Sequence, residues 1–422
     1  MQAANSKSPR RNVTVIGAGI VGMASAIHLQ RDGHDVTVVD RLPPGEATSF
    51  GNAGIMTPCS FVPVTVPGIL RKVPKMLLDP MGPLSLRWSY LPRALPWLLA
   101  YAGNATAEKA ESVAEALSGL ASGAVQEHQA LAKDTGAEPF VRPATYAYVY
   151  KNEAAFERER FAWDLRRKHG VKMTLLRGPE VQEMEPAIGP DHAFAVSLHD
   201  HGFVSDPSRL VKALAEQLER AGGRVLQREV RDIEIGPEGP TRLLTDAEPL
   251  DVDLLIVAAG AWSGVLTKRL GSAVPLESER GYHVVLTDPG IAPRAAIMSS
   301  TGKFVATPMD MGLRVAGLSE FGGLDGPANF KRARTLLKHV QLLFPGVNTE
   351  AFTEWMGHRP ALPDSMPVIG SSPHFDNVYF AFGHQHIGLS TGPKTGRLIA
   401  DLVAGRRPNI DIGAFAVDRF GA

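Results

Sequence analysis

The sequence is poor in cysteine, since Cys59 is the only one among 422 residues. A single cysteine excludes a disulfide within the chain, and it also excludes a zinc or iron–sulfur site that needs several cysteines of one chain. We therefore expect no metal site and a reducing compartment, which indicates a cytoplasmic protein. Long apolar runs are also lacking, because no uninterrupted stretch approaches the ~20 residues that a membrane-spanning helix needs.

An excess of charge of one sign is lacking as well, because 44 Lys and Arg residues balance 44 Asp and Glu residues. The balance leaves no overall basic surface, so nucleic acid is not an expected partner. The hydrophobic fraction of 44% is ordinary for a globular protein, and the length suffices for two domains or one large composite.

A glycine-rich turn lies near the start of the chain, where residues 13–22 read VTVIGAGIVG. The pattern predicts a strand, a tight turn and a helix that begins near Ile20. Gly17 permits the turn, Gly19 lets the backbone approach a pyrophosphate, and Gly22 allows the helix to pack closely on the strand. Phosphates would meet free N–H groups at the positive end of the helix dipole.

Asp40 ends a second apolar segment, residues 35–40. A carboxylate at this place accepts hydrogen bonds from a ribose diol and would repel the extra phosphate of NADP. The expected order and spacing of a dinucleotide site are present: a strand, a turn, a helix, a second strand and an acid. This agreement favours a dinucleotide site over a merely structural turn. This motif alone leaves FAD and NAD open. A second glycine-rich loop, FGNAG at 50–54, indicates another close approach of backbone to a long, extended ligand.

Residues 61–103 differ in composition from their surroundings, with many prolines, the aromatics Trp88, Tyr90, Trp97 and Tyr101, and five cations against one acid. Such a segment can lie on a membrane surface, because cations attract anionic headgroups while Trp and Tyr favour the interface. Alternatively, it is a proline-punctuated cap packed on the active site. We favour the cap, and peripheral contact with the inner face of the cell membrane remains the alternative.

The rest of the chain alternates between strand and helix patterns. A buried parallel strand at 253–260 delivers Ala261, Trp262 and Ser263 to the carboxyl end of a sheet, where ligands bind in open α/β folds. Further helices are predicted at 105–133, 153–169, 207–222, 332–344 and from Leu389 onward, and further strands at 145–150, 225–226, 230–235, 281–286, 303–307, 313–318 and 378–382.

With its motifs taken together, the chain resembles the FAD-dependent D-amino-acid oxidase superfamily. Within that superfamily it is most similar to the bacterial D-amino acid dehydrogenases and to related glycine and sarcosine oxidases. The resemblance extends from Val13 to Gly405 and depends on an ordered set of motifs. These are GAGIVG at 17–22, VVDR ending at 41, TSFGNAG at 48–54, DPSRL at 206–210, AAGAWS at 258–263, GHRPALPDSMPVIG at 357–370 and GHQHIGLSTGPKTG at 383–396.

The resemblance implies a mixed α/β (α+β) fold with two domains, and it implies FAD as the cofactor. A Rossmann-type FAD-binding domain would be assembled from residues 11–60, 203–263 and 353–411. A substrate-binding domain with an antiparallel sheet would consist of residues 61–202 and 264–352.

The same resemblance implies which residues contact FAD. The helix that begins near Leu389 would direct its positive end at the flavin ring, where a reduced flavin gathers negative charge. The implied contacts are Gly17, Gly19, Ile20, Val21, Gly22, Asp40, Arg41, Thr48, Ser49, Asn52, Ala53, Gly54, Val230, Ala259, Gly260, Trp262, Gly383, Ile387, Gly388, Leu389, Ser390 and Thr391.

An amino acid substrate needs a fixed cation for its carboxylate, and Arg359 matches the arginine that serves this purpose in the family. Its planar fork can bind a carboxylate through two parallel hydrogen bonds. The structural alternative is a salt bridge, for example to Asp364. Arg280 and Tyr282 are candidates for further carboxylate contacts, with core packing as an equally acceptable interpretation.

Two histidines, His384 and His386, flank the predicted flavin turn. Either can orient the amine or adjust the flavin through its charge near neutral pH, and we favour His384. Cys59 follows the FGNAG loop, but it does not match the flavin-attachment cysteine of sarcosine oxidases. We therefore expect Cys59 to be a buried neutral thiol.

The predicted reaction is FAD-dependent oxidation of the carbon–nitrogen bond of a D-amino acid or a related amino carboxylate. Hydride would pass to flavin N5, and water would hydrolyse the resulting imine to an oxo acid. The electron acceptor is oxygen or a quinone. One alternative is an oxidase of a secondary amino acid such as sarcosine, D-hydroxyproline or iminodiacetate, and another is a non-catalytic FAD-binding subunit of a larger complex.

Overall fold

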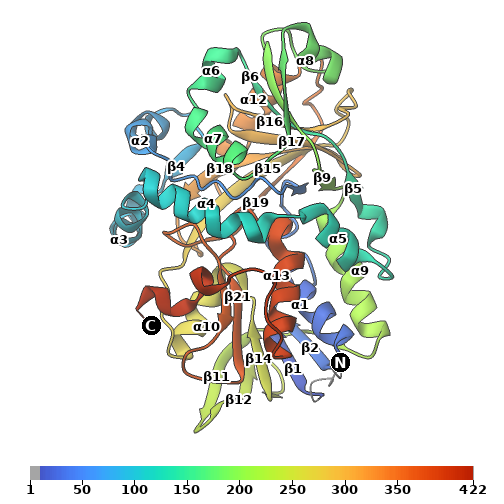
Figure 1. The fold of residues 1–422 in the computed structure, drawn as a ribbon, viewed down its shortest axis with the longest axis vertical. Coiled ribbons are helices and arrows are strands. Elements are labelled where there is room, and N and C mark those ends of the chain that lie inside the picture. The colour runs from blue at the N-terminus through green and yellow to red at the C-terminus, as the bar shows by residue number, and fades with distance from the viewer. Residues whose placement is uncertain (1–9, 422) are drawn as a thin grey trace, which may run out of the picture.

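The structure is a computed structural model that describes residues 10–421. A six-stranded sheet forms the lower half of the molecule in Figure 1. All neighbouring strands in it are parallel except the last pair. Their order is β10 (Arg224–Gln227), β2 (Asp35–Asp40), β1 (Asn12–Ile16), β14 (Leu254–Val257), β21 (Val378–Phe382) and β20 (Val368–Ser371).

The predicted strand, turn, helix and second strand at the start of the chain are confirmed. Helix α1 (Ile20–Arg31) joins β1 to β2, as the glycine pattern predicts. Three more helices belong to this half: α9 (Pro207–Arg220), α10 (Ser263–Arg269) and α13 (Gly388–Val403). Side-chain capping by Asp206 explains the start of α9, because its carboxylate accepts the N–H of Arg209.

An antiparallel three-stranded sheet extends from the six-stranded sheet at the bottom of Figure 1. It consists of β11 (Val230–Gly236), β12 (Gly239–Thr245) and β13 (Leu250–Asp251). The start of β11 at Val230 lies beside the nucleotide end of the sheet, since β10 ends just before it.

A nine-stranded, mainly antiparallel sheet fills the upper half. Only the pairs β16–β6 and β18–β4 are parallel. The order is β19 (Phe352–Ala361), β15 (Glu277–Leu286), β18 (Gly312–Phe321), β17 (Phe304–Met309), β16 (Ala296–Ser299), β6 (Tyr146–Tyr150), β8 (Phe194–Leu198) and β7 (Met173–Arg177), with β4 (Leu84–Leu86) on β18.

Two features differ from the predicted domain boundaries. Strand β19 pairs with β15 along its whole length, so residues 353–361 lie in the sheet of the upper half rather than with the FAD-binding segments. A small sheet of β3 (Ile55–Met56), β9 (Gly202–Val204) and β5 (Val141–Pro143) joins strands from both predicted domains.

The helix predicted at 105–133 is wrong as a single element. It is divided into α4 (Ala107–Ala121) and α5 (Ala124–Ala132), because Gly123 adopts a left-handed conformation with φ of 68°. The helix predicted at 153–169 is likewise two helices. The remaining helices are α2 (Ile69–Leu78), α3 (Leu91–Ala102), α6 (Glu153–Glu157), α7 (Arg160–Lys168), α8 (Pro179–Met184), α11 (Phe330–Ala333) and α12 (Thr335–Leu343), with 3-10 turns at Trp88–Tyr90, Glu138–Phe140, Gly260–Trp262, Gly413–Phe415 and Val417–Phe420.

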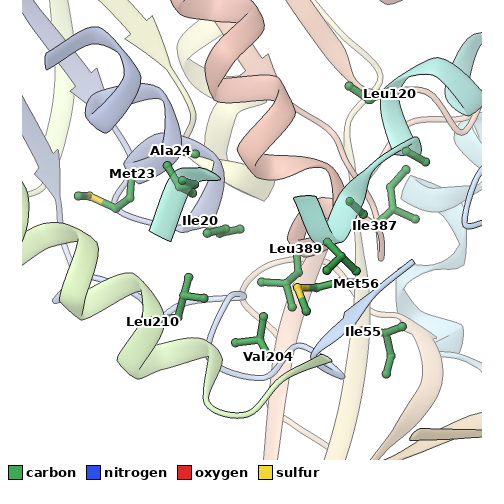
Figure 2. Close-up of a cluster of buried hydrophobic side chains, with 14 of the residues drawn as sticks. Ile20, Met23, Ala24, Ile55, Met56, Leu120, Val204, Leu210, Ile387 and Leu389 are labelled. Carbon is green, nitrogen blue, oxygen red and sulfur yellow. The ribbon is translucent and has the colours of Figure 1, made fainter. Parts of the chain in front are cut away.

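The helices α1 and α13 cross closely at the centre of the molecule. A Cβ on Gly396 would lie 2.4 Å from the carbonyl carbon of Ala24, so glycine lets the two backbones approach. Figure 2 shows side chains from α1, α9, α13 and the strands β3 and β9 converging beside this crossing, among them Ile20, Met56 and Leu389. The shared core fixes the start of α13 relative to the start of α1.

Within residues 10–421, no helix combines the length and the apolar character required to cross a bilayer.

Candidate active site

A cavity of about 530 Å³ runs along the carboxyl ends of the parallel strands. At one end it is bordered by Val230 and Asp40, and at the other by the turn that leads into α13. Sixteen residues predicted to contact the cofactor line it: Gly17, Gly19, Ile20, Val21, Asp40, Arg41, Thr48, Ser49, Asn52, Val230, Ala259, Gly260, Trp262, Gly383, Gly388 and Leu389. The cavity is therefore continuous between the expected nucleotide end and the expected flavin end.

Close packing of backbone explains the first glycines of the turn. Gly17 has φ of 117°, and a Cβ there would lie 2.3 Å from the carbonyl oxygen of Ala258 on the neighbouring strand. A Cβ on Gly22 would lie 1.9 Å from the carbonyl oxygen of Gly17. Gly22 thus serves helix–strand packing and does not line the cavity, whereas Gly19 faces it.

Asp40, the expected ribose ligand, and Ser49 of the following loop hold the glycine turn in place. Asp40 accepts hydrogen bonds from the N–H of Ala18 (2.7 Å) and of Leu42 (3.0 Å). Ser49 Oγ accepts the N–H of Ile20 at 3.0 Å, at the first turn of α1. Both side chains line the cavity, so polar groups surround the phosphate and ribose positions.

Arg41 covers one wall of the cavity by stacking on Trp262, with 3.9 Å between the guanidinium carbon and the ring centroid. The ring of Trp262 in turn meets His358 edge-on at 5.3 Å. Thr48 donates to the carbonyl oxygen of His358 at 2.7 Å. These contacts connect the nucleotide segments to β19, which carries the substrate-side arginine.

The loop at 50–54 is held by a buried arginine that the sequence did not reveal as functional. Arg314 on β18 donates to the carbonyl oxygens of Phe50 and Asn52, both at 2.7 Å. Burial lowers the pKa of Arg314 to about 10. Ala53 and Gly54 lie behind the cavity wall, because Ala53 accepts a hydrogen bond from Thr307 on β17. The substrate-side sheet therefore fixes this cofactor loop.

The turn before α13 borders the end of the cavity where the flavin is expected. Ile387 precedes the helix, and Thr391 donates back to its carbonyl oxygen at 2.9 Å. Ser390 donates to the carbonyl oxygen of Ile55 at 2.8 Å and accepts the N–H of Thr57 at 3.2 Å. Ile387, Ser390 and Thr391 do not line the cavity, so these three position the turn from behind.

The structure separates the two histidines of the turn. His384 is buried and its Nε2 lies 3.0 Å from Thr395 Oγ1 on α13, while burial lowers its pKa to about 3. His386 is exposed to open space, and its titration responds to Glu279 and Arg359. Although the side chain reaches solvent, desolvation of its ring by the surrounding protein atoms and the charge of Arg359 lower the pKa of His386, and Glu279 opposes them. Glu279 and Arg359 thus influence the pKa of His386, whereas His384 is the histidine of this turn that lines the cavity.

Arg359 forms an ion pair that the sequence did not predict. It lies directly opposite Glu279 in the pairing of β19 with β15, and its Nη1 donates to Glu279 Oε1 at 2.8 Å. The alternative partner considered for Arg359, Asp364, is paired with Arg419 at 2.7 Å. Arg359 precedes Pro360 on β19, and Pro360 lines the cavity.

A β-bulge shapes the surroundings of this ion pair. On β18, Leu318 and Ser319 lie opposite the single residue Gly281 of β15, and Leu318 has a left-handed φ of 61°. The bulge directs the Leu318 carbonyl oxygen to Arg359 Nη1 at 3.0 Å. Ser319 Oγ donates to Glu279 Oε1 at 2.6 Å. Such irregular backbone is common beside active sites.

Arg280 and Tyr282 occupy the other face of β15, away from Arg359. Arg280 donates to the carbonyl oxygens of Gly322 and Gly323, at 2.9 and 2.7 Å, and is fully buried. Tyr282 donates to Glu320. The polar atoms of both side chains bond to other protein groups. This arrangement agrees with the alternative that Arg280 and Tyr282 pack in the core, rather than with contacts to a substrate carboxylate.

Cys59 is buried, as predicted, and polar groups surround its sulfur. Its sulfur lies 3.1 Å from Thr57 Oγ1 and 3.4 Å from His201 Nε2. Burial raises the pKa of Cys59, but His201, Arg166 and Thr57 outweigh it and bring the value to about 7. Cys59 is not among the residues that line the cavity.

The residues around the cavity fit FAD. The glycine turn and Ser49 suit a pyrophosphate, Asp40 suits a ribose, and the N-terminus of α13 provides a positive dipole end for an electron-rich ring. The cavity joins these features without interruption, as an extended dinucleotide requires.

Comparisons with known proteins agree with this geometry. The family model described as DAO, FAD dependent oxidoreductase, matches residues 12–402. A D-amino-acid oxidase of Bradyrhizobium diazoefficiens is 38% identical over 417 residues, covering 97% of this chain and 99% of the relative. A D-amino acid dehydrogenase of Chromohalobacter salexigens is 32% identical, covering 97% and 100%.

A solved structure supports the fold. The glycine oxidase of Geobacillus kaustophilus superposes with a TM-score of 0.75 at 22% sequence identity, covering 97% of this chain and 99% of that one. Sequence motifs, cavity and fold thus lead to one conclusion: the chain belongs to the DAO family of FAD-dependent oxidoreductases.

Proposed function

We propose that this flavoenzyme oxidises the carbon–nitrogen bond of D-amino acids. The observation that carries the proposal is the position of Arg359, whose side chain is only 20% exposed and which precedes Pro360, a residue that lines the cavity that fits FAD. A buried, fixed guanidinium is the group that an amino acid carboxylate requires. The names of the relatives, D-amino-acid oxidase and D-amino acid dehydrogenase, support the substrate class.

Arg359 has one edge available for a carboxylate. Its Nη1 already donates to Glu279, to the Leu318 carbonyl and, at 3.4 Å, to Ser319 Oγ. Within residues 10–421, the edge formed by Nη2 and Nε makes a single hydrogen bond, to the Gly317 carbonyl at 3.5 Å. A substrate carboxylate bound side-on at this edge would be oriented without breaking the pair with Glu279.

His386 is placed to take a proton from the substrate amine. Loss of hydride from the α-carbon requires a neutral amine, whereas a free amino acid carries an ammonium group. The lowered pKa of His386 keeps its imidazole neutral near pH 7, so a ring nitrogen can accept that proton. FAD, when bound, supplies the oxidising chemistry by accepting the two electrons of the carbon–hydrogen bond.

The test is anaerobic mixing of the FAD-loaded protein with a panel of D-amino acids, L-amino acids and N-substituted glycines. We expect D-amino acids to bleach the flavin absorbance. Bleaching only by N-substituted glycines would indicate a secondary-amine oxidase, and no bleaching by any of them would refute the proposal in favour of a flavin-binding subunit.

The proposal includes a lipid surface as a partner, through helices α2 and α3. Six large apolar side chains of 61–103 are exposed, with Leu78 at 80% and Trp88 at 67%; the others are Val64, Leu70, Leu95 and Leu99. Five exposed cations accompany them: Arg71, Lys72, Lys75, Arg87 and Arg93. Apolar and cationic side chains on one segment suit an anionic membrane surface.

The inner side of the same segment packs on β18, in the sheet that also carries Arg359. Trp97 on α3 lies 5.3 Å from Phe321 and 4.8 Å from Tyr101, measured between ring centroids. The charge of Glu279, together with burial, raises the pKa of Tyr101. One face of α3 thus covers the substrate-side charges, while its other face carries Leu95 and Leu99 to the surface.

Co-sedimentation with vesicles tests the lipid contact. Vesicles with anionic lipid should bind the wild-type protein, and Leu78→Ser with Trp88→Ser should abolish binding. Leu342→Ser is the matched control, since Leu342 is 67% exposed on α12 outside the segment. Equal binding by all three proteins would refute the contact. For the electron acceptor we propose a quinone dissolved in that lipid surface. The test compares how fast a quinone analogue and air reoxidise the bleached flavin, and faster reoxidation by the quinone analogue is expected.

A further inference from the structure

The ion pair at the substrate side contains an unused oxygen. Both hydrogen bonds to Glu279, from Arg359 and from Ser319, go to Oε1. Among the described residues, no hydrogen bond reaches Oε2, and this oxygen is not among the buried atoms that lack partners. Oε2 is therefore not sealed in the protein interior, and it belongs to the carboxylate that pairs with Arg359.

From this geometry we propose that Glu279 is the amine-recognition residue of the site, whose Oε2 accepts a hydrogen bond from the substrate ammonium while Arg359 holds the substrate carboxylate. The inference rests on the proposed function and makes it more specific. It explains why the carboxylate of Glu279 accompanies Arg359 in a binding site. A lone guanidinium would bind any small carboxylate, whereas the pair favours a carboxylate that also carries an amine.

Charge balance supports this assignment. Arg359 and Glu279 together are neutral, so they match a zwitterion better than an anion. Burial disfavours the charged form of Glu279, but the charge of Arg359 and the hydrogen bond from Ser319 hold the pKa of its carboxyl below the usual range. Glu279 thus stays a carboxylate and binds the amine, while the neutral His386 remains the group that takes the proton.

Position supports it as well. Glu279 and Arg359 face each other across β15 and β19, so the spacing of their charges is fixed by two rigid strands. The side chain of Glu279 is 16% exposed, and Ser319 on β18 holds it through a hydrogen bond. A simple carboxylate would leave Oε2 without a donor from the ligand, and an unpaired charge in a partly buried site is costly.

The experiment compares two ligands that cannot be oxidised at the α-carbon in the amino acid manner. These are 2-aminoisobutyrate, which has no α-hydrogen, and isobutyrate, which has no amine. Their dissociation constants are measured by perturbation of the flavin absorbance in the FAD-loaded wild type and in Glu279→Gln. Binding is thereby separated from turnover.

We expect Glu279→Gln to bind 2-aminoisobutyrate about tenfold or more weakly, since a hydrogen bond to a charged group is lost. Isobutyrate should bind more tightly, because Arg359 loses its competing anion. Glu320→Gln is the control, as Glu320 pairs with Arg280 on the other face of the sheet, and it should leave the ratio of the two constants unchanged.

Opposite shifts for the two ligands cannot arise from a folding defect, which would weaken both. An unchanged ratio, or equal weakening of both ligands in a variant that retains FAD, would overturn the assignment of Glu279. If the wild type is not bleached by any amino acid, the proposed reaction fails, yet the ratio still decides whether Glu279 recognises an amine.

Discussion

Gly281→Ala should move the substrate-binding arginine without unfolding the protein. A Cβ on Gly281 would lie 2.4 Å from Arg359 Nη2 and 2.5 Å from its guanidinium carbon. Ordinary contact begins near 3.4 Å, so the guanidinium must shift by about 1 Å. The clash involves the end of a flexible side chain, and Gly281 does not have a positive φ, so the backbone tolerates alanine.

A displacement of about 1 Å in a binding group can cost on the order of 100-fold in rate. We therefore expect kcat/KM for a D-amino acid to fall by about 10- to 100-fold, mostly through KM, while Tm and FAD content stay near wild type. Anaerobic stopped-flow reduction at several substrate concentrations separates the two constants.

Gly346→Ala is the matched control, because its Cβ would meet only Ile291, at 3.8 Å. It should leave both constants unchanged. If Gly281→Ala retains wild-type KM, Arg359 does not hold the substrate carboxylate in the orientation derived from the structure.

Three further predictions concern stability and pH. Burial lowers the pKa of His283 and His384 to about 3 in the folded protein, so below pH 6.5 the unfolded chain binds more protons than the folded one. Each of the two histidines should therefore reduce the free energy of unfolding by about 1.4 kcal/mol for each pH unit below 6.5. A Tm that is constant from pH 7 to 5 would contradict this. Gly396→Val should lower Tm and release FAD, since overpacking costs ~1–3 kcal/mol and its Cβ would meet Ala24; retention of both would show that α1 and α13 separate easily. The rate of flavin reduction should fall as pH drops through the pKa of His386, below 6.5, and this acid limb should vanish in His386→Asn; an unchanged limb would assign the proton to another group.

Local signals made the nucleotide half predictable. The glycine turn, Asp40 and the buried strand at 253–260 each act through backbone geometry that follows directly from residue type. The cofactor, by contrast, followed only from a resemblance that extends to the turn at Gly383, far along the chain. Sixteen residues expected at the cofactor line one cavity, and the others hold it from behind.

The substrate side was less predictable because its contacts cross strands. Nothing in the order of residues indicates that Glu279 lies opposite Arg359, since this depends on the register of β15 and β19. The bulge at Leu318 and the buried Arg314 depend in the same way on tertiary packing. Alternation along a strand does explain why Arg280 faces away from Arg359. The alternation could be read from the sequence, but it did not show which face of β15 carries the residue opposite Arg359, because that depends on the register of β15 and β19.

The most direct test of the central claim is the dissociation constant of a D-amino acid for the oxidised, FAD-loaded Arg359→Ala variant, obtained from anaerobic reduction kinetics. Truncating one partner of a buried charge pair typically costs several kcal/mol, so we expect affinity to fall by at least about 100-fold while FAD stays bound. Loss of FAD with substrate affinity retained would contradict the role assigned to Arg359.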